Sequence, residues 1–148
     1  GSEMCIRDRH LEGQVRSYNK MIDGVGRLLI TAFAQRLAPP EGNENPNTVL
    51  LCGALCKPPV YRSTPFGREI CDMMLAVNRR YGRADYLPCI AWGQVAVLTG
   101  RLDTGSPLAL EGRVQSRGYT KTVDGVGQER TAYEVSIMRP AEPEEFFL

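Results

Sequence analysis

The sequence lacks histidine near cysteine, a combination that many metal sites and nucleophilic active sites use. Its 148 residues include one histidine, His10, and five cysteines. Cys52 and Cys56 are four residues apart, but no second close pair of ligands accompanies them, so the spacing does not fit a zinc site. The region around these cysteines contains no histidine that could serve as their base. We therefore expect no metal, no cofactor and no catalysis.

The sequence also lacks a long apolar run and a regular cysteine framework. No stretch is long enough to cross a membrane as a helix. The odd number of cysteines and their irregular spacing do not suit a disulfide scaffold. Cys71 and Cys89 lie in apolar, strand-like runs, where cysteine behaves as a small buried hydrophobe. We expect reduced thiols and hence a cytoplasmic protein.

Positive and negative charges nearly balance over the whole chain, but they are distributed unevenly along the sequence. The chain has 18 basic and 17 acidic residues, a net charge of +1. Three of the acidic residues, Glu142, Glu144 and Glu145, lie in the last eight positions, which contain no Lys or Arg. The remaining body has 18 basic and 14 acidic residues, a net charge of +4. A mildly basic body with an acidic tail is a weak indication of a polyanionic partner.

Residues 11–37 and 110–138 form an internal repeat. Both copies open with Leu-Glu-Gly, and both continue to Asp-Gly-Val-Gly, with two more residues between these motifs in the second copy. An apolar run follows each turn, so each copy predicts a β-hairpin. Only the second copy has a full set of strands in front of it. We therefore interpret the first copy as the C-terminal hairpin of a truncated first domain.

The rest of the chain divides by composition. Residues 1–10 have no periodicity and resemble translated adapter sequence, so we expect a non-native leader. Residues 38–46 are rich in Pro, Glu and Asn, which predicts a linker. A complete domain is expected over residues 47–139, followed by an acidic and aromatic tail over residues 140–148.

The complete domain has the pattern of an all-β fold with one short helix. Its segments show the period-2 alternation of strands with one buried face. Five strands with one helix between the third and the fourth is the order of an OB-fold, a five-stranded Greek-key barrel. The expected strands span residues 48–56, 68–78, 85–92, from 108 onward, and 130–138, and the helix spans residues 93–99.

Two predictions about burial follow from these patterns. The helix is expected to place Val95, Leu98 and the neighbouring Ala96 together on one side. In the last strand, alternation predicts that Tyr133, Val135 and Ile137 point inward.

Residues 79–92 combine cations and aromatic rings. Tyr86 and Trp92 are six residues apart, so on an extended strand they point to the same side. Two large π-faces beside several arginines suit a surface that stacks bases and neutralises phosphates. The alternative, equally compatible with this segment alone, is that Tyr86, Ile90 and Trp92 form the core face of a strand.

A second basic segment follows the helix. Arg113, Arg117 and Tyr119 share one face of their strand, and we expect that strand to be a neighbour of the strand with Tyr86 and Trp92. Any single arginine is more often simply solvated. The combination favours a binding surface.

Five short motifs, in this order, resemble those of the bacterial single-stranded DNA-binding protein family. The resemblance covers residues 47–138. The partial repeat, together with Lys-Pro-Pro-Val-Tyr-Arg at residues 57–62, is similar to a variant of that family from Gram-positive bacteria with two OB-folds. The motifs are Val-Leu-Leu-Cys-Gly at 49–53, Thr-Pro-Phe-Gly at 64–67, Leu-Ala-Val-Asn-Arg at 75–79, Ile-Ala-Trp-Gly at 90–93 and Leu-Glu-Gly-Arg-Val at 110–114.

The resemblance implies base-stacking aromatics at Tyr86, Trp92 and Tyr119, with Tyr81 in the loop before them. The family stacks mainly Trp and Phe, so the tyrosines are a departure that predicts weaker stacking. Together with the resemblance, the basic residues of the domain are predicted to contact phosphates. They are Arg62, Arg68, Arg79, Arg80, Arg83, Arg113, Arg117 and Lys121.

The implied function is sequence-tolerant binding of single-stranded DNA in replication, recombination or repair, by a homo-oligomer encoded by a bacterium or its phage. The family's acidic tail recruits repair and replication enzymes, which implies a partner-binding role for Glu144, Glu145, Phe146 and Phe147. A solvated, disordered terminus is the alternative for the tail. The alternative function is a primosome-type OB-fold that bridges proteins, binds DNA weakly and covers its aromatic face in an oligomer.

Overall fold

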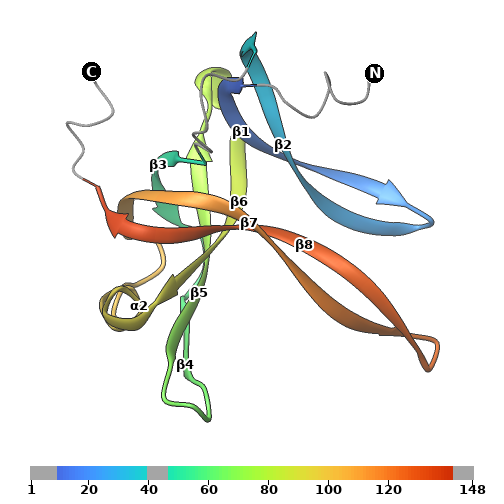
Figure 1. The fold of residues 1–148 in the computed structure, drawn as a ribbon, viewed down its shortest axis with the longest axis vertical. Helices are drawn as coiled ribbons and strands as arrows, with labels where there is room; N and C mark the ends of the chain where they lie inside the picture. Colours follow the sequence, from blue (N-terminus) through green and yellow to red (C-terminus); the bar gives the residue numbers. More distant parts are fainter. Residues whose placement is uncertain (1–9, 40–46, 142–148) are drawn as a thin grey trace. The chain divides into compact units, whose positions relative to one another are not determined.

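The computed structural model describes residues 10–39 and 47–141, and the chain forms two compact units, residues 1–47 and 48–148. Almost all of the predicted leader, most of the predicted linker and the acidic tail with Glu144, Glu145, Phe146 and Phe147 lie outside the described residues. Figure 1 shows the ribbon. The division of the chain into truncated and complete domains stays a prediction.

The first unit is an antiparallel hairpin of β1 (His10–Ile22) and β2 (Val25–Ala38). The two strands are joined by Asp23 and Gly24, whose φ angles are 52° and 77°. A two-residue hairpin turn of this kind needs positive φ at both central positions, which Asp-Gly tolerates better than most pairs. The local sequence therefore determines the hairpin.

The second unit is a six-stranded sheet with the order β3-β7-β8-β6-β5-β4, in which β3 also pairs with β5 and so closes a barrel. This confirms the predicted all-β OB-fold class. The segment before the first predicted turn forms an additional short strand, β4, on β5. The elements are β3 (Val49–Leu55), β4 (Val60–Ser63), β5 (Glu69–Asn78), the 3-10 turn η1 (Arg80–Gly82), β6 (Ala84–Trp92), the helix α2 (Gly93–Thr99), β7 (Pro107–Val123) and β8 (Val126–Pro140).

The barrel encloses an aliphatic core. Leu55, Leu75, Leu87 and Leu110 are almost completely removed from solvent. Burial of each such side chain contributes about 1.5–3 kcal/mol. Where β3 crosses from β7 to β5, an added Cβ on Gly53 would lie 2.2 Å from a backbone carbonyl oxygen, so the closure of the barrel requires glycine there.

One of the inward positions predicted on β8 is wrong. Val135 and Ile137 are buried, but Tyr133 is 53% exposed. The parallel pairing between β6 and β8 covers only Val135 and Ser136 on β8, so Tyr133 lies beyond the strand that would cover it. Figure 1 shows the β7–β8 hairpin, in orange and red, extending past the rest of its unit.

The predicted face of the helix is confirmed for Ala96 and wrong for Leu98. Leu98 is largely exposed, whereas Ala96 and Thr99 are buried. The Thr99 hydroxyl donates to the carbonyl oxygen of Val95 at 2.8 Å, which satisfies its polar group inside the fold. The two-turn helix thus meets the barrel with its small residues rather than with leucine.

Candidate nucleic-acid interface

The register of the sheet determines which side chains share a face, because paired residues on adjacent strands point to the same side. Arg62 on β4 pairs with Ile70 on β5, and Ile70 pairs with Trp92 on β6. Arg62 and Trp92 therefore lie on one face, and Tyr86 joins them by alternation along β6.

The same face continues across β8 to β7. Ile90 on β6 pairs with Ser136 on β8, and Ser136 pairs with Arg113 on β7. Arg117, Tyr119 and Lys121 follow by alternation along β7. We call this surface the sheet face, and its members from the predicted set are Arg62, Tyr86, Trp92, Arg113, Arg117, Tyr119 and Lys121.

The predicted adjacency of the two strands is wrong, although the shared face emerges from the register. The strand order places β8 between β6 and β7. A hairpin can add to a sheet by either of its strands, and here β8 is the one that pairs in parallel with β6. Barrel closure decides this, because the segments are far apart in sequence.

The rings of the sheet face are partly packed and partly open. Tyr86 is 44% exposed, Trp92 39% and Tyr119 43%, whereas Ile90, on the same face of β6, is buried. The core alternative thus holds for Ile90 and is wrong for Tyr86 and Trp92. A ring that is partly packed against the protein and partly open to solvent can stack on a nucleotide base with little further ordering.

The loop before β6 carries the most exposed aromatic ring near this face. Tyr81 in η1 is 97% exposed and has a φ of 73°, a left-handed conformation that is uncommon outside glycine. Arg80 and Arg83 flank it and are exposed. Strained backbone in a basic, exposed loop is typical of functional segments.

Arg79 is committed to a structural contact inside the same loop. Its Nε donates to Oδ2 of Asp85 at 2.8 Å, and its Nη2 donates to Oδ1 of the same carboxylate. Asp85 is buried, and a bidentate pair of this kind fixes both groups. The structure therefore directs Arg79, one of the predicted phosphate contacts, towards a buried carboxylate of the protein itself.

Carboxylates also lie on the sheet face, among them Asp72 and Glu134, and the sequence analysis did not select these two. Glu134 is 6% exposed, accepts a hydrogen bond from Nε2 of Gln115 at 3.0 Å and lies 3.7 Å from Nη2 of Arg117. Asp72 accepts from Nε of Arg62 at 3.2 Å. These pairs orient two of the candidate phosphate-binding guanidinium groups and offset part of their charge. The cross-strand positions of the carboxylates could have been found only with the register in hand.

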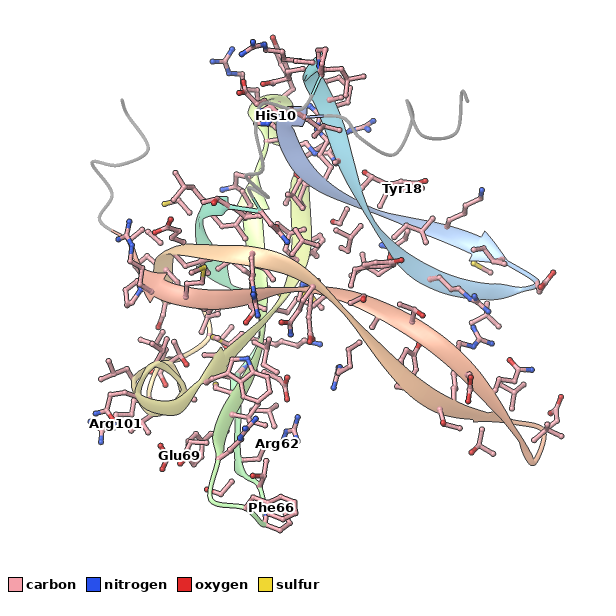
Figure 2. All side chains as sticks on the ribbon, in the orientation of Figure 1. His10, Tyr18, Arg62, Phe66, Glu69 and Arg101 are labelled. Carbon is pink, nitrogen blue, oxygen red and sulfur yellow. The ribbon has the colours of Figure 1, made fainter. Side chains whose placement is uncertain are left out.

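The β4–β5 turn holds a further ring that the sequence analysis did not select. Phe66 is 93% exposed and stands at the tip of the turn in Figure 2, beyond Arg62. The amide of Gly67 donates to the carbonyl of Thr64 at 3.0 Å, and the amide of Arg68 donates to the Thr64 hydroxyl at 3.1 Å. The predicted residue Arg68 is exposed beside this well-bonded turn.

Cys71 and Cys89 are free thiols and are buried, as the apolar runs around them predicted. Burial raises the pKa of Cys89 to about 12 and also raises the pKa of Cys71. Among the described residues, no three His, Cys, Asp or Glu side chains gather closely enough to hold a metal ion. None of the described helices is long and apolar enough to span a membrane.

Comparisons with known proteins identify relatives of the barrel. The chain is 38% identical over 80 residues to "Single-stranded DNA-binding protein 1" of Staphylococcus aureus (strain COL), which is 49% of this chain and 48% of that protein. It is 36% identical over 80 residues to "Single-stranded DNA-binding protein A" of Bacillus subtilis (strain 168), which is 49% of this chain and 46% of that protein. The chain therefore spans about half the length of the curated relatives it matches.

A solved structure has the same fold. The wild-type single-stranded DNA-binding protein from Thermus aquaticus superposes with a TM-score of 0.73 at 27% sequence identity, covering 91% of this chain and 58% of that one. The model of the single-strand binding protein family matches residues 46–140, which is well over half of the chain. These matches confirm the family resemblance found in the sequence motifs, and the chain belongs to the single-strand binding protein family.

Proposed function

We propose that the chain binds single-stranded DNA on the sheet face, without sequence preference. The observation that supports this most directly is the pair of half-exposed rings, Tyr86 and Trp92, on the same face as Arg113, Arg117 and Lys121. Stacking contributes about 1–3 kcal/mol per base and tolerates any base, because every base has a π-face. The cations neutralise phosphates and make the affinity depend on salt.

We further propose that this binding serves replication, recombination or repair, that the protein acts as a homo-oligomer, and that Glu144, Glu145, Phe146 and Phe147 dock on partner enzymes. Support comes from the names of the relatives, which are single-stranded DNA-binding proteins. On the same grounds the exposed loop with Arg80, Tyr81 and Arg83, and Arg68 in the β4–β5 turn, extend the DNA contact at the edges of the sheet face.

Trp92 provides the decisive experiment, since it is the only tryptophan. Its fluorescence should be quenched by oligo-dT, and Trp92→Ala should weaken binding by about 1–3 kcal/mol while the barrel stays folded. Arg113 has no ion pair within the described ranges. Arg113→Ser should therefore lower the slope of log affinity against log salt concentration by about 0.7. Fluorescence that does not respond to saturating oligo-dT in a folded protein would contradict the proposal.

A protein-bridging module with weak DNA affinity is the second candidate. The carboxylates Asp72 and Glu134 on the sheet face favour it, because they offset Arg62 and Arg117 where a phosphate would otherwise bind. This candidate predicts that Trp92 fluorescence changes with protein concentration, as the face becomes covered in an oligomer, and not with added DNA.

A further inference from the structure

The loop between β5 and β6 is closed at its base by backbone hydrogen bonds. The last pair of the β5–β6 ladder joins Asn78 to Ala84. One step further, the amide of Arg79 donates to the carbonyl oxygen of Arg83 at 2.6 Å. The three residues of η1, Arg80–Gly82, span the remaining gap. The direction in which this short loop presents its side chains therefore depends on few torsion angles.

Two of those residues have a left-handed backbone. The φ angles are 73° at Tyr81 and 78° at Gly82. Glycine adopts this conformation readily, whereas the Cβ of tyrosine makes it unfavourable. A residue stays in such a conformation only when the surrounding structure imposes it. The position of the Tyr81 ring therefore needs a constraint from outside η1.

The ion pair of Arg79 and Asp85 supplies that constraint. Arg79 immediately precedes η1, and Asp85 follows the loop on β6. Nε of Arg79 donates to Oδ2 of Asp85 at 2.8 Å, and Nη2 donates to Oδ1. Two parallel hydrogen bonds from a planar guanidinium fix the orientation of both groups. We call this pair the Arg79–Asp85 clamp.

The clamp is anchored on the inner side of the barrel. Asp85 alternates along β6 with the buried residues Leu87 and Cys89, so it lies on the core side of the strand, opposite to Tyr86. Its side chain is 5% exposed and that of Arg79 is 24% exposed. The cost of desolvating such a pair offsets much of its attraction, so stability alone does not explain it. Its clearest effect is to hold the start of the loop in one orientation.

The other side chains of the loop are left for a ligand. Arg80 and Arg83 are exposed, and they flank the almost fully exposed ring of Tyr81. Because the guanidinium of Arg79 is already paired, the clamp separates one structural arginine from two arginines that face solvent. The loop also leads directly into the strand that carries Tyr86 and Trp92.

We propose that Arg79 and Asp85 are positioning residues for DNA binding. The clamp holds the loop so that Tyr81 stacks on a base, and Arg79 itself contacts no phosphate. The proposal rests on the proposed function for the ligand. A loop that is ordered before binding loses less conformational freedom when it binds, which raises the affinity. The alternative is that Arg79 leaves Asp85 and neutralises a phosphate.

Asp85→Asn separates these two roles, because they predict changes of opposite sign. The affinity of the full chain for labelled oligo-dT is measured by fluorescence anisotropy. Without the clamp, about one residue of backbone must be ordered on binding, so the affinity should fall by about 5- to 30-fold. If Arg79 bound a phosphate, its release from Asp85 would tighten binding instead. An unchanged or tighter affinity would overturn the proposal.

Arg79→Lys tests the other side of the clamp. Lysine keeps the positive charge that a phosphate contact needs, but it lacks the planar fork that binds both carboxylate oxygens. We expect a loss of affinity similar to that of Asp85→Asn, and wild-type affinity would overturn the proposal. If Asp85→Asn does not fold, this variant decides. Arg101→Gln removes an exposed cation after α2, labelled in Figure 2, and should leave the affinity unchanged.

A double-mutant cycle shows whether the clamp acts through Tyr81. Tyr81→Ala alone should weaken binding by about 5- to 150-fold, the contribution of one stacked base. In the Asp85→Asn background the same substitution should weaken binding much less, because the ring is no longer held in place. Independent effects that multiply in the double variant would contradict a positioning role.

Hydrogen exchange tests the clamp without DNA and keeps the two proposals apart. The Arg79 amide, which bonds to Arg83, should exchange faster in Asp85→Asn and in Arg79→Lys, while the amides of the β5–β6 ladder stay protected. Unchanged exchange of this amide would overturn the clamp. A wild-type Trp92 that ignores saturating oligo-dT would overturn the proposed function, and the exchange result would still decide whether the clamp orders the loop. Quenched Trp92 with unchanged affinity in both variants would overturn the positioning role alone.

Discussion

The two hairpins of this protein share a local design and differ in their surroundings. Both have an Asp-Gly turn, a glycine at the register shift and a Glu–Arg pair across the strands. β7 pairs on its other edge with β3, and β8 with β6, whereas within residues 10–39 and 47–141 the strands β1 and β2 pair only with each other. Leu110 is completely buried as a result, and its counterpart Leu11 is 45% exposed. The comparison shows that turn chemistry makes a hairpin, but neighbouring strands turn one of its faces into a core.

The largest difference is expected when the two leucines are shortened. Leu110→Ala leaves a cavity in the barrel and should lower its free energy of unfolding by about 2–5 kcal/mol. Leu11→Ala removes an exposed side chain and should change barrel stability by less than about 0.5 kcal/mol. Denaturant unfolding followed by Trp92 fluorescence measures both, since Trp92 lies in the barrel. Equal losses would show that Leu11 is buried by a partner.

The glycines at the register shift should give a smaller difference. Gly112→Ala brings a Cβ against the Ser136 carbonyl oxygen and within 2.9 Å of Cγ1 of Val135, so we expect the barrel to lose about 1–3 kcal/mol. Gly13→Ala clashes as closely with Phe33 but should leave barrel unfolding unchanged. Hydrogen exchange of the β1–β2 amides should then report its effect. Barrel unfolding shifted by Gly13→Ala would show that the two units are coupled.

Alkaline pH should destabilise the barrel through Cys89, a buried thiol that has no counterpart in the first hairpin. The pKa of Cys89 is about 12 in the folded state, against an ordinary value of 9.0. Below pH 9 both states keep the proton. Above it the unfolded state releases the proton first, so stability falls with rising pH, by about 1.4 kcal/mol per unit until about pH 12.

Urea titrations at pH 8 and pH 10 measure this loss. Cys89→Ala should remove its contribution to the pH dependence, whereas Cys52→Ala, which removes an exposed thiol, should leave the dependence unchanged. A Cys89→Ala variant with the wild-type pH dependence would contradict the assignment.

The ion pairs should give the smallest effect. Arg139 pairs with Glu111, and both side chains are partly exposed, so Arg139→Ser should cost about 0.2–1 kcal/mol and less at high salt. The corresponding pair of Arg36 and Glu12 is more exposed, and Arg36→Ser should not affect barrel unfolding. A larger loss from Arg36→Ser than from Arg139→Ser would contradict the comparison.

Much of the fold could be predicted because its signals are local. The Asp-Gly turns, the alternation in β5 and β7 and the short helix before Gly100 each depend on residues close together in sequence. The predictions of burial failed where the packing of distant segments determines whether a side chain is covered. Tyr133 was expected inside but lies beyond the end of the β6–β8 pairing, and Leu98 was expected inside but faces away from the barrel.

The candidate site also combines groupings that local alternation predicts with contacts that only the tertiary structure reveals. Alternation along single strands was enough to group Tyr86 with Trp92, and Arg113 with Arg117 and Tyr119. It could not show that Glu134 lies between these groups, since β8 separates the two strands only in the closed sheet. Neither could it show that Arg79 pairs with Asp85, which depends on the path of the loop.

By itself, the sequence determined where the strands and turns lie, the duplication of one hairpin and the supply of rings and cations along two strands. These features follow from side-chain periodicity and from turns that few residue pairs can form. Tertiary structure alone decided which faces are covered, which arginines meet a carboxylate, and that the rings and cations share one side of the sheet. Pairing between distant strands sets these properties, because the strand order and register place side chains that no local pattern brings together.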